Sequence, residues 1–202
     1  EWETLLAEGA TVSVERLYER ERTLHFDDPI NIQYTSGTTG HPKGATLTHH
    51  NILNNAWFVG EVLGYTERDR VCVPVPFYHC FGMVLGNLAT LARGGCVVAP
   101  GEAFAAKPTL EAVAAERCTS LYGVPTMFRC LLEEPGFAQY DVTSLRTGIM
   151  AGAPCPIELM REVIDKLHMP EVAIGYGMTE TSPISTMSLR DDPIERRVST
   201  VG

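Results

Sequence analysis

Short apolar runs alternate with longer amphipathic segments along the chain from residue 30 onward. The apolar runs predict strands at 30–34, 71–75, 96–99, 120–123, 144–151 and 171–176. The segments between them predict helices at 81–92, 109–117, 156–167 and from Pro125 onward. Strands separated by helices of about ten to fifteen residues indicate βαβ units. We therefore expect an α/β fold with a mostly parallel sheet flanked by helices.

A further helix is expected after Thr48, whose hydroxyl can cap the first turn, with Gly64 as its stop. Its expected apolar face consists of Ile52, Leu53, Ala56, Val59 and Leu63. Residues 1–28 are instead rich in charge, and we expect a solvated helical segment without catalytic chemistry there. The sequence thus predicts a charged N-terminal segment at 1–28 and a domain at 29–202.

Charge and composition limit the classes of partner that the chain could bind. The formal net charge is −9, and lysine and arginine do not cluster, which argues against nucleic acid or an anionic membrane. No apolar stretch reaches the roughly 18 residues of a membrane span, and no signal-peptide pattern opens the chain. We expect a cytoplasmic protein, with a targeting segment removed upstream as the open alternative.

The six cysteines lack Cys-x-x-Cys spacing, so we expect reduced, packed thiols. The adjacent His49 and His50 predict no metal site.

The strongest chemical signal lies at 34–44, which reads Tyr-Thr-Ser-Gly-Thr-Thr-Gly-His-Pro-Lys-Gly. Glycines let a backbone approach an anion closely, and consecutive N–H groups and hydroxyls bind phosphate oxygens. The pattern is not a Walker A loop, because Lys43 follows Pro42 and precedes Gly44. We predict a nucleotide-phosphate loop that consists of Thr35, Ser36, Gly37, Thr38, Thr39, Gly40 and Lys43.

Three further motifs follow this loop in order: Pro-Phe-Tyr-His-Cys-Phe-Gly at 76–82, Ala-Gly-Ala-Pro at 151–154 and Tyr-Gly-Met-Thr-Glu at 176–180. Together the four motifs resemble those of the adenylate-forming enzymes, which include acyl-CoA synthetases, luciferases and the adenylation domains of peptide synthetases. Within this family the chain resembles the medium-chain acyl-CoA synthetase branch and its bacterial relatives. The resemblance runs from about residue 29 to 202 and implies part of that family's large N-terminal domain.

The resemblance implies a reaction in two halves. A carboxylate attacks the α-phosphate of ATP to give an acyl-adenylate and pyrophosphate, and the thiol of coenzyme A then displaces AMP. The phosphate loop with Lys43 would bind the β- and γ-phosphates. Thr179 would meet the α-phosphate and the substrate carboxylate, and Glu180 would hold Mg²⁺. One carboxylate with phosphate oxygens and water is an ordinary magnesium environment.

The resemblance also implies which residues bind the adenine and the acid. Tyr176, between Gly175 and Gly177, would stack on adenine, and Gly152, Ala153 and Pro154 would contact it through backbone groups. The chain departs from a common family pattern at Ile174, where many relatives carry Asn or Gln. His79 would line the carboxylate end of an acyl pocket whose other candidates are Phe81, Leu85, Val124, Gly152, Gly175, Met178 and Ile184. Residues 76–82 offer no acid to pair a substrate ammonium, which favours a fatty or aryl acid.

Two other functions stay open: an adenylation domain that loads a carrier protein, and a nucleotide-binding module without catalysis. The family's ribose-binding aspartate, its hinge and its C-terminal domain with the adenylation lysine would lie beyond residue 202. We therefore expect a central fragment of a larger enzyme, inactive in isolation and with exposed apolar surface. Such a surface favours self-association, so a homo-oligomer is a further expectation.

Overall fold

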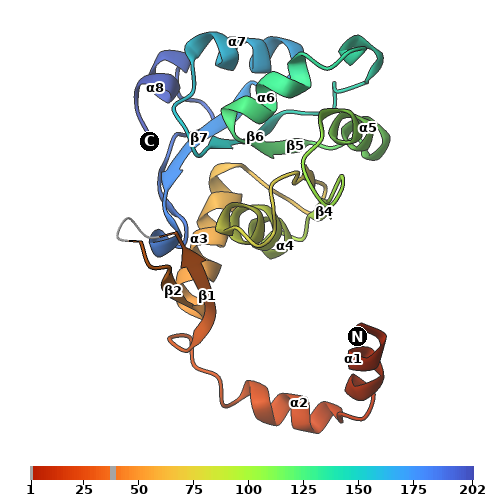
Figure 1. Cartoon of the computed structure of the whole chain (residues 1–202), viewed down its shortest axis with the longest axis vertical. Coiled ribbons are helices and arrows are strands. Elements are labelled where there is room, and N and C mark those ends of the chain that lie inside the picture. The colour runs from red at the N-terminus through yellow and green to blue at the C-terminus, as the bar shows by residue number, and fades with distance from the viewer. Residues whose placement is uncertain (1, 37–39) are drawn as a thin grey trace.

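A six-stranded, mostly parallel sheet forms the centre of the computed structural model, which describes residues 2–36 and 40–202 (Figure 1). Its strands are β3 (Arg70–Cys72), β4 (Cys96–Val98), β5 (Ser120–Gly123), β6 (Thr147–Ala151), β7 (Glu171–Gly177) and β8 (Ile184–Met187). They lie in the order β4-β3-β5-β6-β7-β8, and every neighbouring pair is parallel except β7 and β8. The predicted fold class is confirmed, but the antiparallel edge strand β8 was not predicted.

Helices cover both faces of this sheet (Figure 1). One face carries α3 (His49–Val62), the π-helix η1 (Phe81–Leu88) and α4 (Ala89–Ala92); the other carries α5 (Ala106–Glu116), α6 (Pro125–Leu132), α7 (Ile157–Lys166) and α8 (Ile194–Ser199). Central strand residues alternate between two apolar cores, with Leu121 and Met150 in one and Tyr122 and Ile149 in the other. Burial on both faces explains why these strands are continuous apolar runs. No described helix has the length and apolar character needed to cross a membrane.

The first predicted strand is real but belongs to a separate hairpin. β1 (Pro29–Thr35) pairs antiparallel with β2 (Lys43–Thr48), and Thr35 lies opposite Lys43. The expectation that residues 30–34 begin a βαβ unit was therefore wrong, because the chain turns back on itself before any helix intervenes. The phosphate loop predicted from sequence connects the two strands, and its residues Gly37, Thr38 and Thr39 lie outside the described residues.

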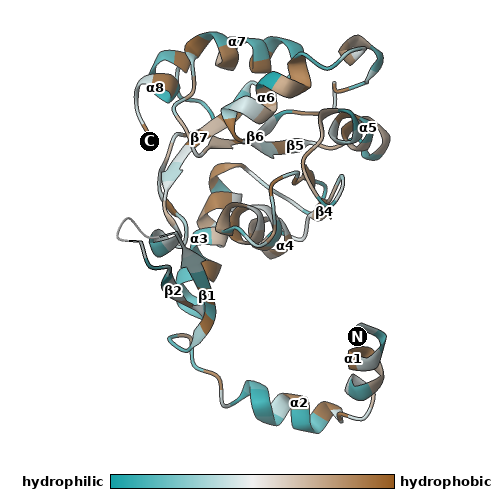
Figure 2. Ribbon diagram, in the orientation of Figure 1, coloured by the Kyte–Doolittle hydropathy of each residue, from teal (hydrophilic) through white to brown (hydrophobic). Residues whose placement is uncertain are grey.

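Two short helices, α1 (Trp2–Gly9) and α2 (Val14–Glu21), precede the hairpin and lie apart from the sheet (Figure 1). Neither helix buries a residue. Figure 2 shows both as mixed teal and brown ribbons with no part of the body packed against them. Exposed apolar side chains continue onto the hairpin, where Ile30, Ile32 and Tyr34 point to the outside of β1.

The cap predicted for α3 is confirmed. The Thr48 hydroxyl accepts a hydrogen bond from the Asn51 N–H at 3.2 Å, and the Asn51 side chain accepts one from the Thr48 N–H at 3.3 Å. Gly64, with φ of +62°, ends the helix in the left-handed region as expected. Leu53 is the one wrong member of the predicted apolar face, because it is 55% exposed.

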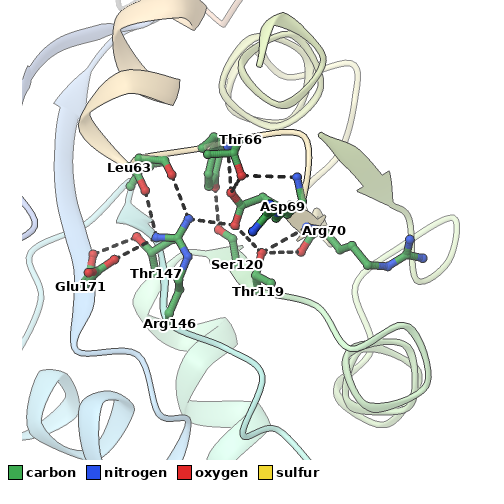
Figure 3. Close-up of polar contacts among 12 residues, drawn as sticks. Leu63, Thr66, Asp69, Arg70, Thr119, Ser120, Arg146, Thr147 and Glu171 are labelled. Atoms are coloured by element: carbon green, nitrogen blue, oxygen red, sulfur yellow. Dashed lines mark hydrogen bonds and ion pairs between the residues drawn. The ribbon is translucent and has the colours of Figure 1, made fainter. Parts of the chain in front are cut away.

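A polar network ties the amino ends of the strands to the turn after α3 (Figure 3). Arg146 donates to the Leu63 and Gly64 carbonyls and to the carboxylates of Asp69 and Glu171, at 2.8–3.2 Å. Burial opposes ionisation of Asp69, but hydrogen bonds from Thr119, Arg146 and Thr66 outweigh it and lower its pKa. This network lies at the opposite end of the strands from the candidate site, so its role is structural.

Candidate active site

A cavity of about 360 Å³ opens at the carboxyl ends of β6 and β7. In open α/β sheets this edge is the usual place for ligands. The cavity is lined by Thr35, His79, Cys80, Phe81, Leu85, Ala151, Gly152, Gly175, Gly177, Met178, Thr179, Glu180, Pro183 and Ile184. Four segments that are far apart in the sequence therefore meet here.

The hairpin reaches this cavity although it is not part of the main sheet. Strand β2 contacts the short 3₁₀-helix η3 (Thr179–Thr181) that follows β7. Thr35, at the end of β1, shares the cavity lining with Thr179 and Glu180. Lys43 is exposed at the start of β2, opposite Thr35. The two ends of the predicted phosphate loop, Thr35 and Lys43, thus belong to the hairpin that contacts η3, where Thr179 and Glu180 lie.

His79 is oriented by the backbone that follows it. The Phe81 N–H donates to His79 Nδ1 at 3.0 Å, so the neutral ring carries its proton on Nε2. His79 lines the cavity next to Cys80, whose Sγ lies 3.8 Å from the Thr179 hydroxyl. Burial raises the pKa of the Cys80 thiol, which keeps it protonated and able to donate to Thr179. The sequence analysis did not identify Cys80 as a site residue, because a cysteine in an apolar run predicts a packed core residue.

Part of the cavity lining is apolar. Phe81, Leu85, Met178 and Ile184, all predicted from sequence as pocket residues, contribute to this lining. Phe81 stacks on Tyr122 of β5 with ring centroids 5.7 Å apart, and Tyr122 is fully buried. Val124 is the one candidate that is not in this lining; it lies behind Gly152, where an added Cβ would come within 3.1 Å of its side chain.

A second cavity of about 640 Å³ adjoins the first. Its lining contains the predicted adenine-binding residues Gly152, Ala153, Pro154 and Tyr176, together with Cys155, Ile174, Gly175, Gly177 and residues 197–201. Tyr176 is 48% exposed, so it is accessible to a ligand in this cavity. Gly152, Gly175 and Gly177 line both cavities, so the two spaces meet at residues that have no side chain.

Residues 197–201 were not predicted to approach a ligand. They begin with Arg197, whose guanidinium donates to the carbonyls of Pro170, Val172, Arg190 and Asp192 at 2.7–3.0 Å. These bonds hold α8 against the start of β7. No motif in the sequence marks this helix, because its contacts are made by one arginine with backbone atoms.

The described residues contain no cluster of three or more acidic, His or Cys side chains that could form a metal site by themselves. Glu180 is exposed in η3 and lies in the same cavity lining as Thr35 and Thr179. A single carboxylate suits a cation that takes its remaining ligands from phosphate and water. Ser36 and Gly40, which flank residues 37–39, are also exposed.

A mostly parallel sheet thus carries two adjoining cavities at its carboxyl edge, and the two linings share Gly152, Gly175 and Gly177. The sequence model of the AMP-binding enzyme family matches residues 2–202, and the chain belongs to this family. This confirms the resemblance drawn from the four motifs.

Named relatives agree with this assignment. The chain is 46% identical over 200 residues to "Medium-chain acyl-CoA ligase ACSF2, mitochondrial" of Danio rerio, covering 98% of this chain and 33% of the relative. It is 45% identical over 201 residues to "Acyl-CoA ligase sidI" of Aspergillus fumigatus, covering 100% and 34%. The solved anthranilate CoA ligase AuaEII in complex with anthranoyl-AMP superposes with a TM-score of 0.78 at 28% identity, over 86% of this chain and 33% of that one. The chain spans about a third of the length of the curated relatives it matches.

Proposed function

We propose that this chain contributes the phosphate, adenine and acid sites of an enzyme that activates a carboxylic acid with ATP and transfers the acyl group to coenzyme A. The observation that carries the proposal is the convergence of Thr35, His79 and the Thr179–Glu180 pair on one cavity beside a second, larger one. The structure of the similar ligase AuaEII was solved with an acyl-adenylate, anthranoyl-AMP.

The first half-reaction needs electrostatic stabilisation more than a base. A free carboxylic acid has a pKa close to that of Glu, about 4.3, so the nucleophile is already ionised at neutral pH. Its oxygen attacks the α-phosphorus, and the bond to pyrophosphate breaks. Lys43 and the loop hydroxyls would offset the charge on the departing pyrophosphate, while Thr179 would donate to the α-phosphate. In the second half, the thiolate of coenzyme A attacks the acyl carbon and AMP leaves.

Glu180 is the residue that would hold Mg²⁺. Its exposed carboxylate stands in the cavity lining near the hydroxyls of Thr35 and Thr179, which fits a cation shared with phosphate oxygens. When bound, the cation would neutralise charge on the phosphates. The roles of this chain's own residues remain orientation of the carboxylate, through His79 and Thr179, and binding of the phosphates.

The apolar wall supports a fatty acid as substrate. Phe81, Leu85, Met178 and Ile184 offer no charge, and a buried ammonium without a partner is costly. Glu180 is the carboxylate among the described lining residues, and the proposal assigns it to magnesium. We favour a medium- or long-chain acid, in keeping with the name of the Danio rerio relative.

The organisation of the whole protein is also a proposal. We assign residues 29–202 to the AMP-binding domain and residues 1–28 to a solvated segment, because α1 and α2 bury no side chain. A cytoplasmic location and a homo-oligomer stay predictions, and one relative is named as mitochondrial. Lipid metabolism is the broad process into which such a ligase would fit.

The test is acid-dependent ATP–pyrophosphate exchange by the full-length protein, followed by thioester formation on addition of coenzyme A. Lys43→Ala should lower exchange by about 10²–10³, the usual cost of deleting one donor to a developing charge. Lys107→Ala is the matched control, because Lys107 is an exposed surface residue on α5 that lines neither cavity.

Three outcomes would count against the proposal. Exchange within tenfold of wild type in Lys43→Ala would reject the role of that lysine. Exchange without thioester formation on coenzyme A, but with acylation of a carrier protein, would favour the carrier-loading alternative. ATP binding with no exchange for any acid would reduce the protein to a nucleotide-binding module.

A further inference from the structure

Asn55 of α3 holds the backbone of Ile184 from across the molecule. Its side-chain Oδ1 accepts a hydrogen bond from the Ile184 N–H at 3.2 Å, and its Nδ2 donates to the Ile184 carbonyl at 2.8 Å. Nδ2 also lies 3.5 Å from the Thr181 carbonyl. One half-buried carboxamide thus serves both polar backbone groups of a single residue that lies 129 positions away in the sequence.

These contacts occur where the sheet ends. Ile184 is the first residue of β8, the last strand in the sheet order, and it pairs with Gly177 on its other side. A backbone N–H and C=O at a sheet edge need a partner. The primary amide of Asn55 has the same donor and acceptor as a backbone peptide, so it replaces a neighbouring strand at this one residue.

The position of Ile184 matters for the cavity. A Cβ added to Gly175 would come within 2.8 Å of Ile184 Cδ1, so the isoleucine side chain packs directly over the glycine. Both residues line the 360 Å³ cavity. A displacement of the Ile184 backbone therefore changes the width of this cavity without changing any residue that lines it.

We propose that Asn55 is a positioning residue that fixes Ile184 and thereby sets the selectivity of the cavity among carboxylic acids. The inference rests on the proposed function, because it takes the 360 Å³ cavity as the acid site. Asn55 itself is not in the lining of either cavity, so it acts through Ile184 and not by touching the substrate.

The measurement is kcat/KM of the full-length protein for a series of straight-chain acids that differ by one methylene each, with thermal unfolding measured on the same preparations. One methylene in a well-formed apolar pocket changes kcat/KM by about 10–200-fold. We expect Asn55→Ala to reduce the ratio between neighbouring acids by about threefold or more. Asn55→Asp keeps the volume and the acceptor of the Ile184 N–H, but it sets a carboxylate oxygen against the Ile184 carbonyl, so its ratio should fall as well.

Asn54→Ala is the matched control. Asn54 is exposed and, among the described residues, donates within α3 alone, to the His50 carbonyl at 2.8 Å, so its removal should leave the ratio unchanged. The ratio separates positioning from general stability, because partial unfolding lowers kcat/KM for every acid by the same factor. Ile184→Val removes one methyl from the same wall and provides a second test if the Asn55 variants do not accumulate.

An unchanged ratio in folded Asn55→Ala or Asn55→Asp would overturn the inference, and so would an unchanged ratio in Ile184→Val. The outcome separates the two proposals. Wild-type protein that shows no acid-dependent pyrophosphate exchange would reject the proposed function and the inference together. Active wild type with unaltered selectivity in the variants would reject the inference alone.

Discussion

Replacing Arg146 tests how much the network at the amino ends of the strands contributes to stability. The Arg146 guanidinium makes four hydrogen bonds, two to carboxylates and two to carbonyls. Its Asp69 partner has a side chain only 6% exposed, whereas Arg146 is 33% and Glu171 37% exposed. The variant Arg146→Met keeps much of the aliphatic stem and removes the charge and all four bonds.

The expected loss in the free energy of unfolding is about 2–4 kcal/mol. Removing one member of a fully buried pair costs roughly 3–5 kcal/mol. The partial exposure of Arg146 reduces this figure, because water can reach Glu171 and the freed carbonyls. The Asp69 carboxylate also keeps its bonds from Thr119 and Thr66, at 2.7 and 2.8 Å. A loss of this size corresponds to roughly 5–12 °C in Tm for a cooperative unit of about 200 residues.

The control is Arg161→Met. Arg161 pairs with Glu158 at 2.8 Å, the same distance as between Arg146 and Asp69, but the two side chains are 50% and 72% exposed. An exposed pair of this kind contributes about 0–1 kcal/mol, so its loss should barely change Tm. Equal losses in the two variants would show that burial does not decide the contribution and would refute the reasoning.

The same experiment has a pH dependence of known sign. The folded pKa of Asp69 lies below its unfolded value of about 3.9, so its contribution is complete above that value and disappears as the pH falls through the folded pKa. The difference between wild type and Arg146→Met should therefore be constant near neutral pH and shrink below about pH 4. A difference that grows in acid would contradict the assignment of Asp69 as the stabilised group.

Two further predictions concern the cavities. Glu180→Gln keeps the shape of the side chain but removes its charge, so the midpoint of a magnesium titration of adenylate formation should rise; an unchanged midpoint and maximal rate would return Glu180 to a surface role. Tyr176→Ala removes the accessible ring of the second cavity and should raise the KM for ATP by about tenfold, using the roughly 1–3 kcal/mol measured for base stacking on aromatics. An equal rise in the KM for the acid would instead indicate a general disturbance of the shared edge.

Much of the fold could be predicted because its central strands are buried on both faces. The runs at 120–123 and 171–176 have almost no polar positions, and the structure forms β5 and β7 there. The helix cap at Thr48 could also be predicted, since it depends on two residues three positions apart. Helix 81–92 was also confirmed, although its first two turns have π-helical bonding, which no local pattern indicated.

The pairing of the hairpin and of β8 could not be predicted. β2 is only six residues long, with Ala45 and Leu47 as its buried positions, and such a pattern does not specify a partner. The first residue of β8 bonds to Asn55, which is distant in the sequence and gives no local signal. For the same reason the motifs identified the residues around the cavities but not the residues that hold them in place.

The three glycines shared by the two cavities restrict how the acid specificity of such a site can diverge. A side chain added at Gly175 would meet Ile184, and one added at Gly177 would come within 1.8 Å of the Pro183 carbonyl oxygen. In the proposed function, a substitution at one of these glycines would alter the nucleotide site and the acid site together. Mutations that change the acid preference without impairing ATP use are therefore expected at residues that line the smaller cavity alone, such as Phe81, Leu85 and Ile184. As substrate preference diverges in this fold, we expect the shared glycines to stay and the other residues of the smaller cavity to vary.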